Sequence, residues 1–175
     1  VINVPIYRND SETNDNNWNF IGNPYPSAID ADAFLAANTS IDQNVNGTDG
    51  AIYFWSHNTA ADGDTNGNEN LNYTQSDYAI INGTGQNAGG DGVVPTRHIP
   101  SGQGFFVSMS DASTSTAVSG SIRTTDVVFN NSMRVTGNND QFFRTSNIVQ
   151  YNKIRLDLTS DNGIFNQILV GYVNG

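Results

Sequence analysis

The sequence contains no cysteine, and this absence removes several kinds of chemistry at once. Without cysteine the chain forms no disulfide, offers no thiolate to a metal ion and carries no cysteine nucleophile. Histidine is also scarce, because His57 and His98 are the only two in 175 residues. The absence of cysteine does not identify the cellular compartment, since an exported protein need not contain disulfides.

Positive charge is the second shortage. Lysine occurs once, at Lys153, and lysine and arginine together number 7 against 17 aspartate and glutamate residues, for a formal net charge of −10. Nucleic acids and anionic membrane surfaces are bound largely through clustered basic side chains. We therefore expect neither as a partner. No apolar run approaches the ~20 residues of a membrane span, so we expect no membrane insertion.

The residues that are abundant favour strands and turns. Asn, Gly, Thr and Ser are frequent, and charged residues make up only 14% of the chain. The length suits one buried core, so we expect a single β-sandwich domain over residues 1–175. The segment Val1–Pro5 has no signal-peptide pattern, so the chain is either a mature product or an internal fragment of a larger polypeptide, and its strand-like residues favour the fragment.

The clearest strand pattern lies near the end of the chain. Polar and apolar residues alternate along Lys153–Leu158, which predicts a half-buried strand with Ile154, Leu156 and Leu158 facing the core. A short turn and the apolar run Ile164–Val173 follow, and together the two segments predict a β-hairpin.

Further strands are expected between clusters of Gly, Asn and Asp. This spacing is typical of an all-β fold, an antiparallel β-sandwich or a jelly-roll with long polar loops. The expected strands are Val4–Tyr7, Trp18–Ile21, Ala51–Ser56, Tyr78–Ile81, Gly104–Met109, Ala117–Ile122, Val127–Phe129 and Phe142–Arg144.

One alanine-rich segment, residues 27–37, predicts a short surface helix instead of a strand. Ser27 and Asp30 resemble a capping box in which Asp replaces Glu. Asn38 is a suitable residue to end the helix.

An oxygen-rich loop is the candidate metal site. Asp62, Asp64 and Asn66 stand at alternate positions and Gly67 occupies the sharp-turn position, as in an EF-hand calcium loop. The twelfth position, where a glutamate normally completes the shell, is Tyr73. Calcium is the one cofactor that the sequence suggests, and the missing carboxylate favours a solvated loop between two strands instead.

Enzyme and nucleotide-binding motifs are weak. Residues 83–88 spell a GxGxxA fingerprint, but more glycines follow where a helix would have to begin. Ser101 lies three residues after His98, which predicts a turn and not a catalytic triad. We expect no enzyme, although a glycosidase with two convergent carboxylates, or a peptidase, stays an open alternative.

Four aromatic residues, Trp18, Tyr25, Tyr53 and Trp55, are candidates for a ligand-binding platform that stacks against sugar rings. Within a strand, Tyr53 and Trp55 share one face while Phe54 points to the other, so one set belongs to the core. Carbohydrate binding predicts that at least two of the four rings are exposed and coplanar.

A set of phrases spread over nearly the whole chain resembles a region of large secreted and surface proteins of Bacteroidota, particularly of flavobacterial type. In those proteins the region is similar to the segment ahead of the C-terminal sorting domain of the type IX secretion system. The phrases are Trp18–Asp30, Ile52–Thr59, Asn72–Gly85, Ile99–Val107, Asn131–Val135, Asn152–Thr159 and Leu169–Tyr172.

The resemblance implies export to the medium or the cell surface and carries over no active site. It suggests a non-catalytic accessory, stalk or adhesive domain that contacts other domains of its parent chain, and glycans or other cell-surface components. The alternative is a carbohydrate-binding module of a secreted polysaccharide-degrading enzyme.

Overall fold

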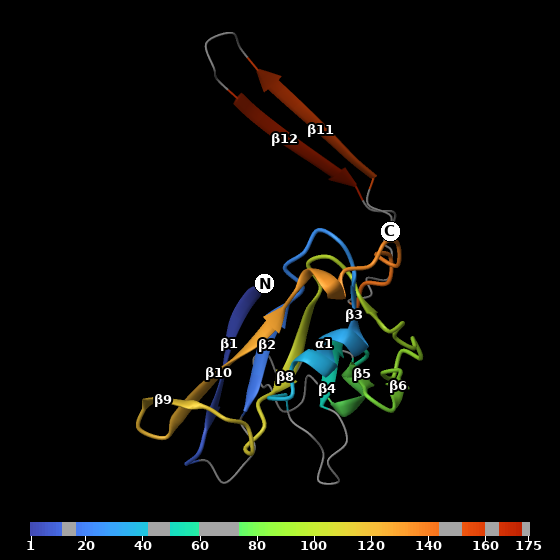
Figure 1. Cartoon of the computed structure of the whole chain (residues 1–175). Coiled ribbons are helices and arrows are strands. Elements are labelled where there is room, and N and C mark those ends of the chain that lie inside the picture. Colours follow the sequence, from blue (N-terminus) through green and yellow to red (C-terminus); the bar gives the residue numbers. More distant parts are fainter. Residues whose placement is uncertain (12–16, 42–49, 60–73, 144–151, 160–164, 173–175) are drawn as a thin grey trace, which may run out of the picture. The chain divides into compact units, whose positions relative to one another are not determined.

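The computed structural model describes residues 1–11, 17–41, 50–59, 74–143, 152–159 and 165–172 (Figure 1). The chain divides into two compact units, Val1–Arg144 and Thr145–Gly175. Each unit is described by itself below. The single domain expected over residues 1–175 stays a prediction.

The described residues form antiparallel β-sheets with one short α-helix, which confirms the predicted all-β sandwich class. The larger unit contains β1 (Ile2–Asn9), β2 (Trp18–Gly22), β3 (Ile29–Asp30), α1 (Ala31–Ala37), β4 (Ala51–Trp55), β5 (Tyr78–Asn82), β6 (Gly85–Asn87), β7 (His98–Ile99), β8 (Gly104–Ser108), β9 (Thr116–Ser119) and β10 (Ile122–Phe129). Two short 3₁₀ turns, η2 (Gln75–Asp77) and η3 (Asn131–Met133), precede β5 and follow β10.

A five-stranded sheet with the order β2-β8-β4-β5-β6 dominates the larger unit. A three-stranded sheet, β1-β10-β9, and the short pair β3-β7 complete its strand pairing. Strands β2 and β8 are neighbours although more than eighty residues separate them in the sequence. The sheet order therefore brings together side chains from distant parts of the chain.

A side-chain amide joins the two larger sheets. Asn19, on the edge strand β2, accepts a hydrogen bond from the Tyr7 backbone N–H and donates one to the Tyr7 carbonyl, each at 2.9 Å. The amide thus imitates a backbone pairing between β2 and β1. This pairing satisfies main-chain groups that an edge strand would leave open.

The helix α1 begins four residues later than the predicted cap at Ser27. Asp30 is the N-cap, and its side chain accepts a hydrogen bond from the Ala33 backbone N–H. Residues 29 and 30 lie in β3, so the capping box starting at Ser27 is wrong. Asn38 ends the helix as predicted, and its amide also bonds both backbone groups of Val128 in β10.

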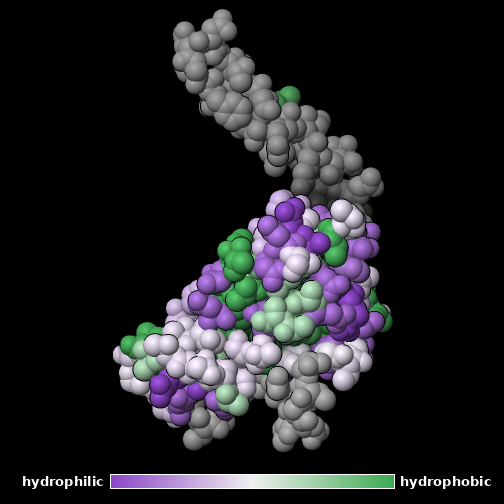
Figure 2. All heavy atoms as spheres, viewed as in Figure 1, coloured by the Kyte–Doolittle hydropathy of each residue, from purple (hydrophilic) through white to green (hydrophobic). Residues whose placement is uncertain are grey.

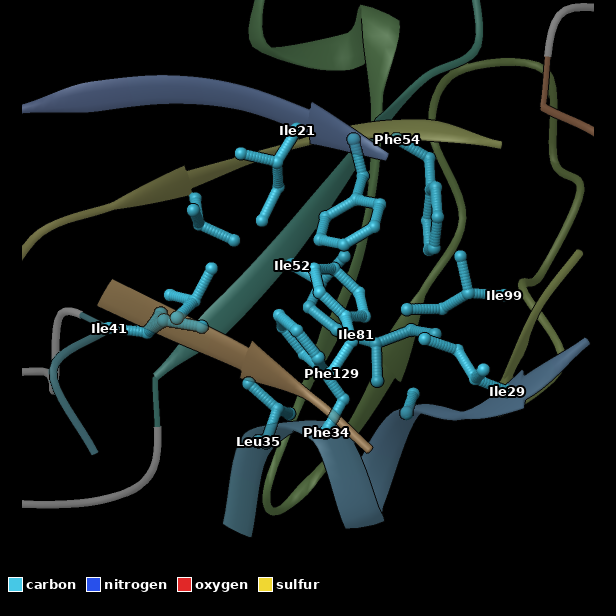
Figure 3. Close-up of a cluster of buried hydrophobic side chains, with 14 of the residues drawn as sticks. Ile21, Ile29, Phe34, Leu35, Ile41, Ile52, Phe54, Ile81, Ile99 and Phe129 are labelled. Atoms are coloured by element: carbon cyan, nitrogen blue, oxygen red, sulfur yellow. The ribbon is translucent and has the colours of Figure 1, made fainter. Parts of the chain in front are cut away.

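The core lies between the five-stranded sheet, β1, β10 and the helix. Phe34 and Leu35 point from the helix into a cluster that includes Ile81 and Phe129 (Figure 3). Alternation along the strands supplies the other members, because every second residue of a strand faces the same side. The fully buried large side chains are Phe34, Phe54, Phe105, Phe129, Ile6, Ile29, Ile41, Ile52, Ile81, Ile99, Met109 and Met133.

The smaller unit contains the predicted hairpin, formed by β11 (Asn152–Thr159) and β12 (Phe165–Tyr172). Leu156 lies directly opposite Ile168 in the register, and both side chains are exposed. The expectation that Leu156 faces a core is therefore wrong, since alternation gives a residue's face but not whether that face is covered. The side chains of Ile154 and Leu158 lie outside the described part of the chain.

Two predicted strands differ from the structure. The segment 117–122 is not one strand, because the chain reverses at Gly120, which has a φ of 56°, and β9 and β10 flank that turn. Phe142 and Phe143 lie outside any strand. The pairs β3 and β7, and the three-residue β6, were not predicted because they are too short to show alternation.

The surface of the larger unit is mostly polar on the face that Figure 2 shows, where hydrophobic residues form small separate groups. Among the described residues, no helix is both long enough and apolar enough to span a membrane.

Candidate ligand-binding surface

The five-stranded sheet has one face in the core and the other lined with aromatic rings. Within β4, Phe54 is fully buried, whereas Tyr53 and Trp55 on either side of it are half-buried and face outward. The predicted division of these three residues between two faces is confirmed. The same alternation places Phe106 outward and Phe105 in the core.

The register aligns the outward rings across neighbouring strands. Phe20 of β2 is paired with Phe106 of β8, and Phe106 is paired with Tyr53 of β4. Tyr53 is in turn paired with Ile80 of β5. On the adjacent row, Trp55 is paired with Tyr78. Large side chains thus form a continuous surface over β2, β8, β4 and β5, which we call the aromatic surface.

Small residues give the largest rings room to lie across the sheet. Trp18 is paired with Ser108 and reaches Tyr53, with ring centroids 4.8 Å apart and an interplanar angle of 84°. The Phe20 ring lies over Gly104, where a Cβ atom would overlap it. Both rings remain accessible, because 47% of Trp18 and 65% of Phe20 is exposed.

A groove of about 560 Å³ crosses this surface. One or two residues from each of four adjacent strands line it, and Gln75 of η2 adds an amide at the end next to β5. The lining residues are Trp18, Tyr53, Gln75, Tyr78, Ile80 and Phe106. The described lining residues offer aromatic faces, the Gln75 amide and the hydroxyls of Tyr53 and Tyr78, and none of these residues is charged. This combination suits a neutral ligand with apolar faces.

The structure does not meet the expectation of two exposed, coplanar rings, because only Trp18 of the four is exposed. Trp18, Tyr53 and Trp55 lie on the aromatic surface, but Trp18 and Tyr53 are nearly perpendicular and so are not coplanar. Trp55 is nearly parallel to the imidazole of His57, at 17° with centroids 6.0 Å apart.

Tyr25 lies away from the aromatic surface. Its side chain is buried, and the guanidinium of Arg134 lies over its ring, 5.4 Å from the centroid. The turn containing Tyr25 is held by Asn23, whose amide nitrogen donates to the carbonyls of Ile99 and Pro100. This aromatic residue is part of the framework of the turn.

Sequence reasoning missed Gln75, Tyr78, Ile80 and Phe106 as members of the surface. A period-two pattern in β8 and β5 was visible in the sequence. However, the pattern does not reveal which strands are neighbours.

The proposed calcium ligands Asp62, Asp64 and Asn66 lie outside the described residues, so calcium stays a prediction. No group of three or more His, Asp or Glu side chains able to hold a metal ion occurs in the ranges that the structure describes.

Asp77 joins Thr59, which follows β4, to Thr74, which precedes η2. The Asp77 carboxylate is buried and accepts hydrogen bonds from the Thr59 hydroxyl, the Thr59 N–H and the Thr74 N–H. Burial raises the pKa of Asp77, but these hydrogen bonds, with one from the Asn58 N–H, outweigh burial and lower the pKa overall. Asp77 thereby fixes η2, the turn that carries Gln75.

The weak enzyme motifs take structural roles. The Ser101 hydroxyl donates to the Tyr25 carbonyl at 2.8 Å and makes no bond to His98. The GxGxxA segment forms a turn and then β6, so no helix begins there. Arg97 donates to the carbonyls of Asn82 and Gly85 and pairs with Asp32, which attaches β6 to the helix.

The fold and this surface define an antiparallel β-sandwich domain with an aromatic groove on the outer face of its larger sheet. The chain belongs to the family described as Domain of unknown function (DUF8693), which matches residues 1–175. No curated protein and no solved structure matches the chain.

Proposed function

We propose that this chain is a non-catalytic accessory domain of a secreted or cell-surface bacterial protein, and that it binds carbohydrate through the aromatic surface. The observation that carries the proposal is the groove lined by Trp18, Tyr53, Tyr78 and Phe106. Large rings normally fill cores, so an accessible row of them is a feature of binding surfaces.

The chemistry of the groove favours sugar over other ligands. The C–H faces of a pyranose ring pack against aromatic faces, while its hydroxyl groups need hydrogen-bond partners such as the Gln75 amide. None of the lining residues within the described ranges is charged, which supports a neutral glycan and gives an acidic one no counter-ion among them. The net charge of −10 would repel a polyanion further.

Binding is tested with a glycan array followed by isothermal titration calorimetry on the glycans that bind. Trp18→Ala is expected to weaken binding about fivefold or more, because it removes a stacking face worth about 1 kcal/mol or more. Val118→Ala is the matched control, since Val118 is 55% exposed on β9 of the other sheet. It should leave the affinity unchanged.

Two results would contradict carbohydrate binding. One is the absence of any binding across the array, and the other is an equal effect of Trp18→Ala and Val118→Ala. Either result would leave a stalk or spacer role for the accessory domain.

Export by type IX secretion is a separate part of the proposal, and the resemblance to flavobacterial surface proteins supports it. The parent protein should appear in the medium or on the cell surface of its native host. It should accumulate inside cells when the type IX apparatus is deleted. Unchanged export in that strain would contradict this part.

A further inference from the structure

We propose that the ligand is an extended, unbranched glycan of about four sugar units that crosses the strands of the five-stranded sheet. Strands lie about 4.8 Å apart, so four neighbouring strands span roughly 14 Å. This inference rests on the proposed carbohydrate function and adds the length and direction of the ligand.

The direction follows from where the groove-lining residues originate. Trp18 comes from β2, Phe106 from β8, Tyr53 from β4, and Tyr78 and Ile80 from β5. These strands are consecutive neighbours in the sheet order β2-β8-β4-β5. A ligand that follows the groove therefore crosses four neighbouring strands.

The spacing of the strands suggests one sugar unit for each strand, although the rings lean together, as Trp18 of β2 and Tyr53 of β4 do with centroids 4.8 Å apart. A pyranose ring is about as wide as the separation of two strands, which is ~4.8 Å. Because Trp18 and Tyr53 are nearly perpendicular, a ligand beside them meets two ring faces at different angles. A chain whose successive units face different ways is matched by rings at different angles, whereas a single flat sugar contacts only one of them.

The two ends of the groove differ in chemistry. The β2 end is the accessible indole of Trp18, and the β5 end is the exposed amide of Gln75. The Gln75 side chain makes no hydrogen bond to another described residue. The hydrogen bonds of Asp77 fix the turn η2, which carries Gln75. Gln75 is thus positioned to donate to a sugar hydroxyl, which gives the bound chain a direction.

The residues that line the groove favour a glycan over a protein as the ligand. Of the six lining residues that the structure describes, four are aromatic, one is the aliphatic Ile80 and none is charged. A protein partner of this strongly acidic chain would be expected to use basic side chains, and the groove offers them no carboxylate.

The test is a length series measured by calorimetry on the whole chain. The probes are neutral unbranched oligosaccharides of glucose, xylose and mannose, each with one to six units. Affinity is expected to rise with every unit up to about four and then to level off. A tenfold rise corresponds to a gain of about 1.4 kcal/mol in binding free energy.

Variants at the two ends sharpen the measurement. Gln75→Glu keeps the size of the side chain but removes its N–H donor, and Trp18→Ala removes the opposite end. Each should lower the affinity for the six-unit chain about tenfold and make the curve level off at a shorter length. Val118→Ala should leave the curve unchanged.

The outcomes separate this inference from the proposed function. A glycan that binds as tightly with one unit as with six would overturn the extended-chain inference and leave carbohydrate binding intact. If the affinity levels off at the same oligosaccharide length in Gln75→Glu and Trp18→Ala as in the native chain, the assigned direction across the strands is overturned. No binding by any probe on the array or in the series would overturn both proposals.

Discussion

The carboxylate of Asp77 accepts hydrogen bonds from both the hydroxyl and the backbone N–H of Thr59. It also accepts one from the Thr74 N–H at 2.7 Å, so a single buried side chain joins Thr59 to Thr74. These bonds connect the residues that follow β4 to η2, the turn that leads into β5. They also explain why a charge is tolerated in a buried position.

Asp77→Asn should destabilise the larger unit. Asparagine keeps one acceptor but turns an NH₂ group toward N–H and O–H donors, which leaves buried donors without a partner. The expected loss is about 1–3 kcal/mol in the free energy of unfolding, measured by urea denaturation. An unchanged urea midpoint would contradict the stabilising role of the Asp77 hydrogen bonds to Thr59 and Thr74.

The pH dependence of stability should report the same carboxylate. The pKa of Asp77 is lower in the folded than in the unfolded chain, so its contribution is complete above the unfolded value of about 4. That contribution is lost as the pH falls through the folded pKa. Urea midpoints from pH 6 to pH 2 should therefore fall more steeply for the native chain than for Asp77→Asn.

Asp32 provides the comparison for this titration. The hydrogen bond from Arg97 lowers the pKa of Asp32 as well, but more than half of the Asp32 side chain is exposed to solvent. Solvent screens such a pair, so Asp32→Asn should change the acid profile much less. An Asp32→Asn profile as flat as that of Asp77→Asn would contradict the importance of burial.

Two adjacent phenylalanines should respond to very different extents to the same substitution. Phe143 is buried, stacks on Phe54 at 4.8 Å, and has both backbone groups bonded by the Gln103 amide. Phe143→Ala should cost about 3–5 kcal/mol in urea unfolding. Phe142 is 51% exposed, and Phe142→Ala should stay within about 0.5 kcal/mol of the native chain.

A single methyl group at Gly104 should disturb the aromatic surface. A Cβ atom there would overlap the tip of the Phe20 ring, and the exposed ring would swing away at little cost in stability. Gly104→Ala should change the free energy of unfolding by less than about 1 kcal/mol and should weaken glycan binding. Calorimetry on the bound glycan measures the second effect.

Gly85→Ala is the matched control for that substitution. Gly85 lies in β6 of the same sheet, and a Cβ atom at that position would meet no other atom within 4 Å. The control should bind like the native chain. Equal binding by both variants would show that the position of Phe20 does not matter to the ligand.

Much of the fold could be predicted from local patterns. Alternating residues located β1, β2, β4, β5, β8 and the hairpin β11–β12, because a strand with one buried face repeats every two residues. The helix ended at Asn38 as predicted, but its start was placed too early because Asp30, not Ser27, caps it. The reversal at Gly120 was missed because the residues on both sides of it have strand character.

The sequence by itself determined that Phe54 and its neighbours Tyr53 and Trp55 occupy opposite faces, since the side-chain period of a strand is two. Only the tertiary structure decided which face became the core. That choice depends on what packs against the sheet, and here the helix and β10 cover the face of Phe54.

The aromatic surface was likewise decided by long-range pairing. Phe20, Phe106 and Tyr53 stand in one row because β2 joins β8 and β8 joins β4, and no local pattern encodes that order. Tyr25 was also a candidate for the platform, but the turn around Asn23 buries it away from the aromatic surface. Backbone periodicity acts within a strand, whereas the order of strands is set by the packing of the whole core.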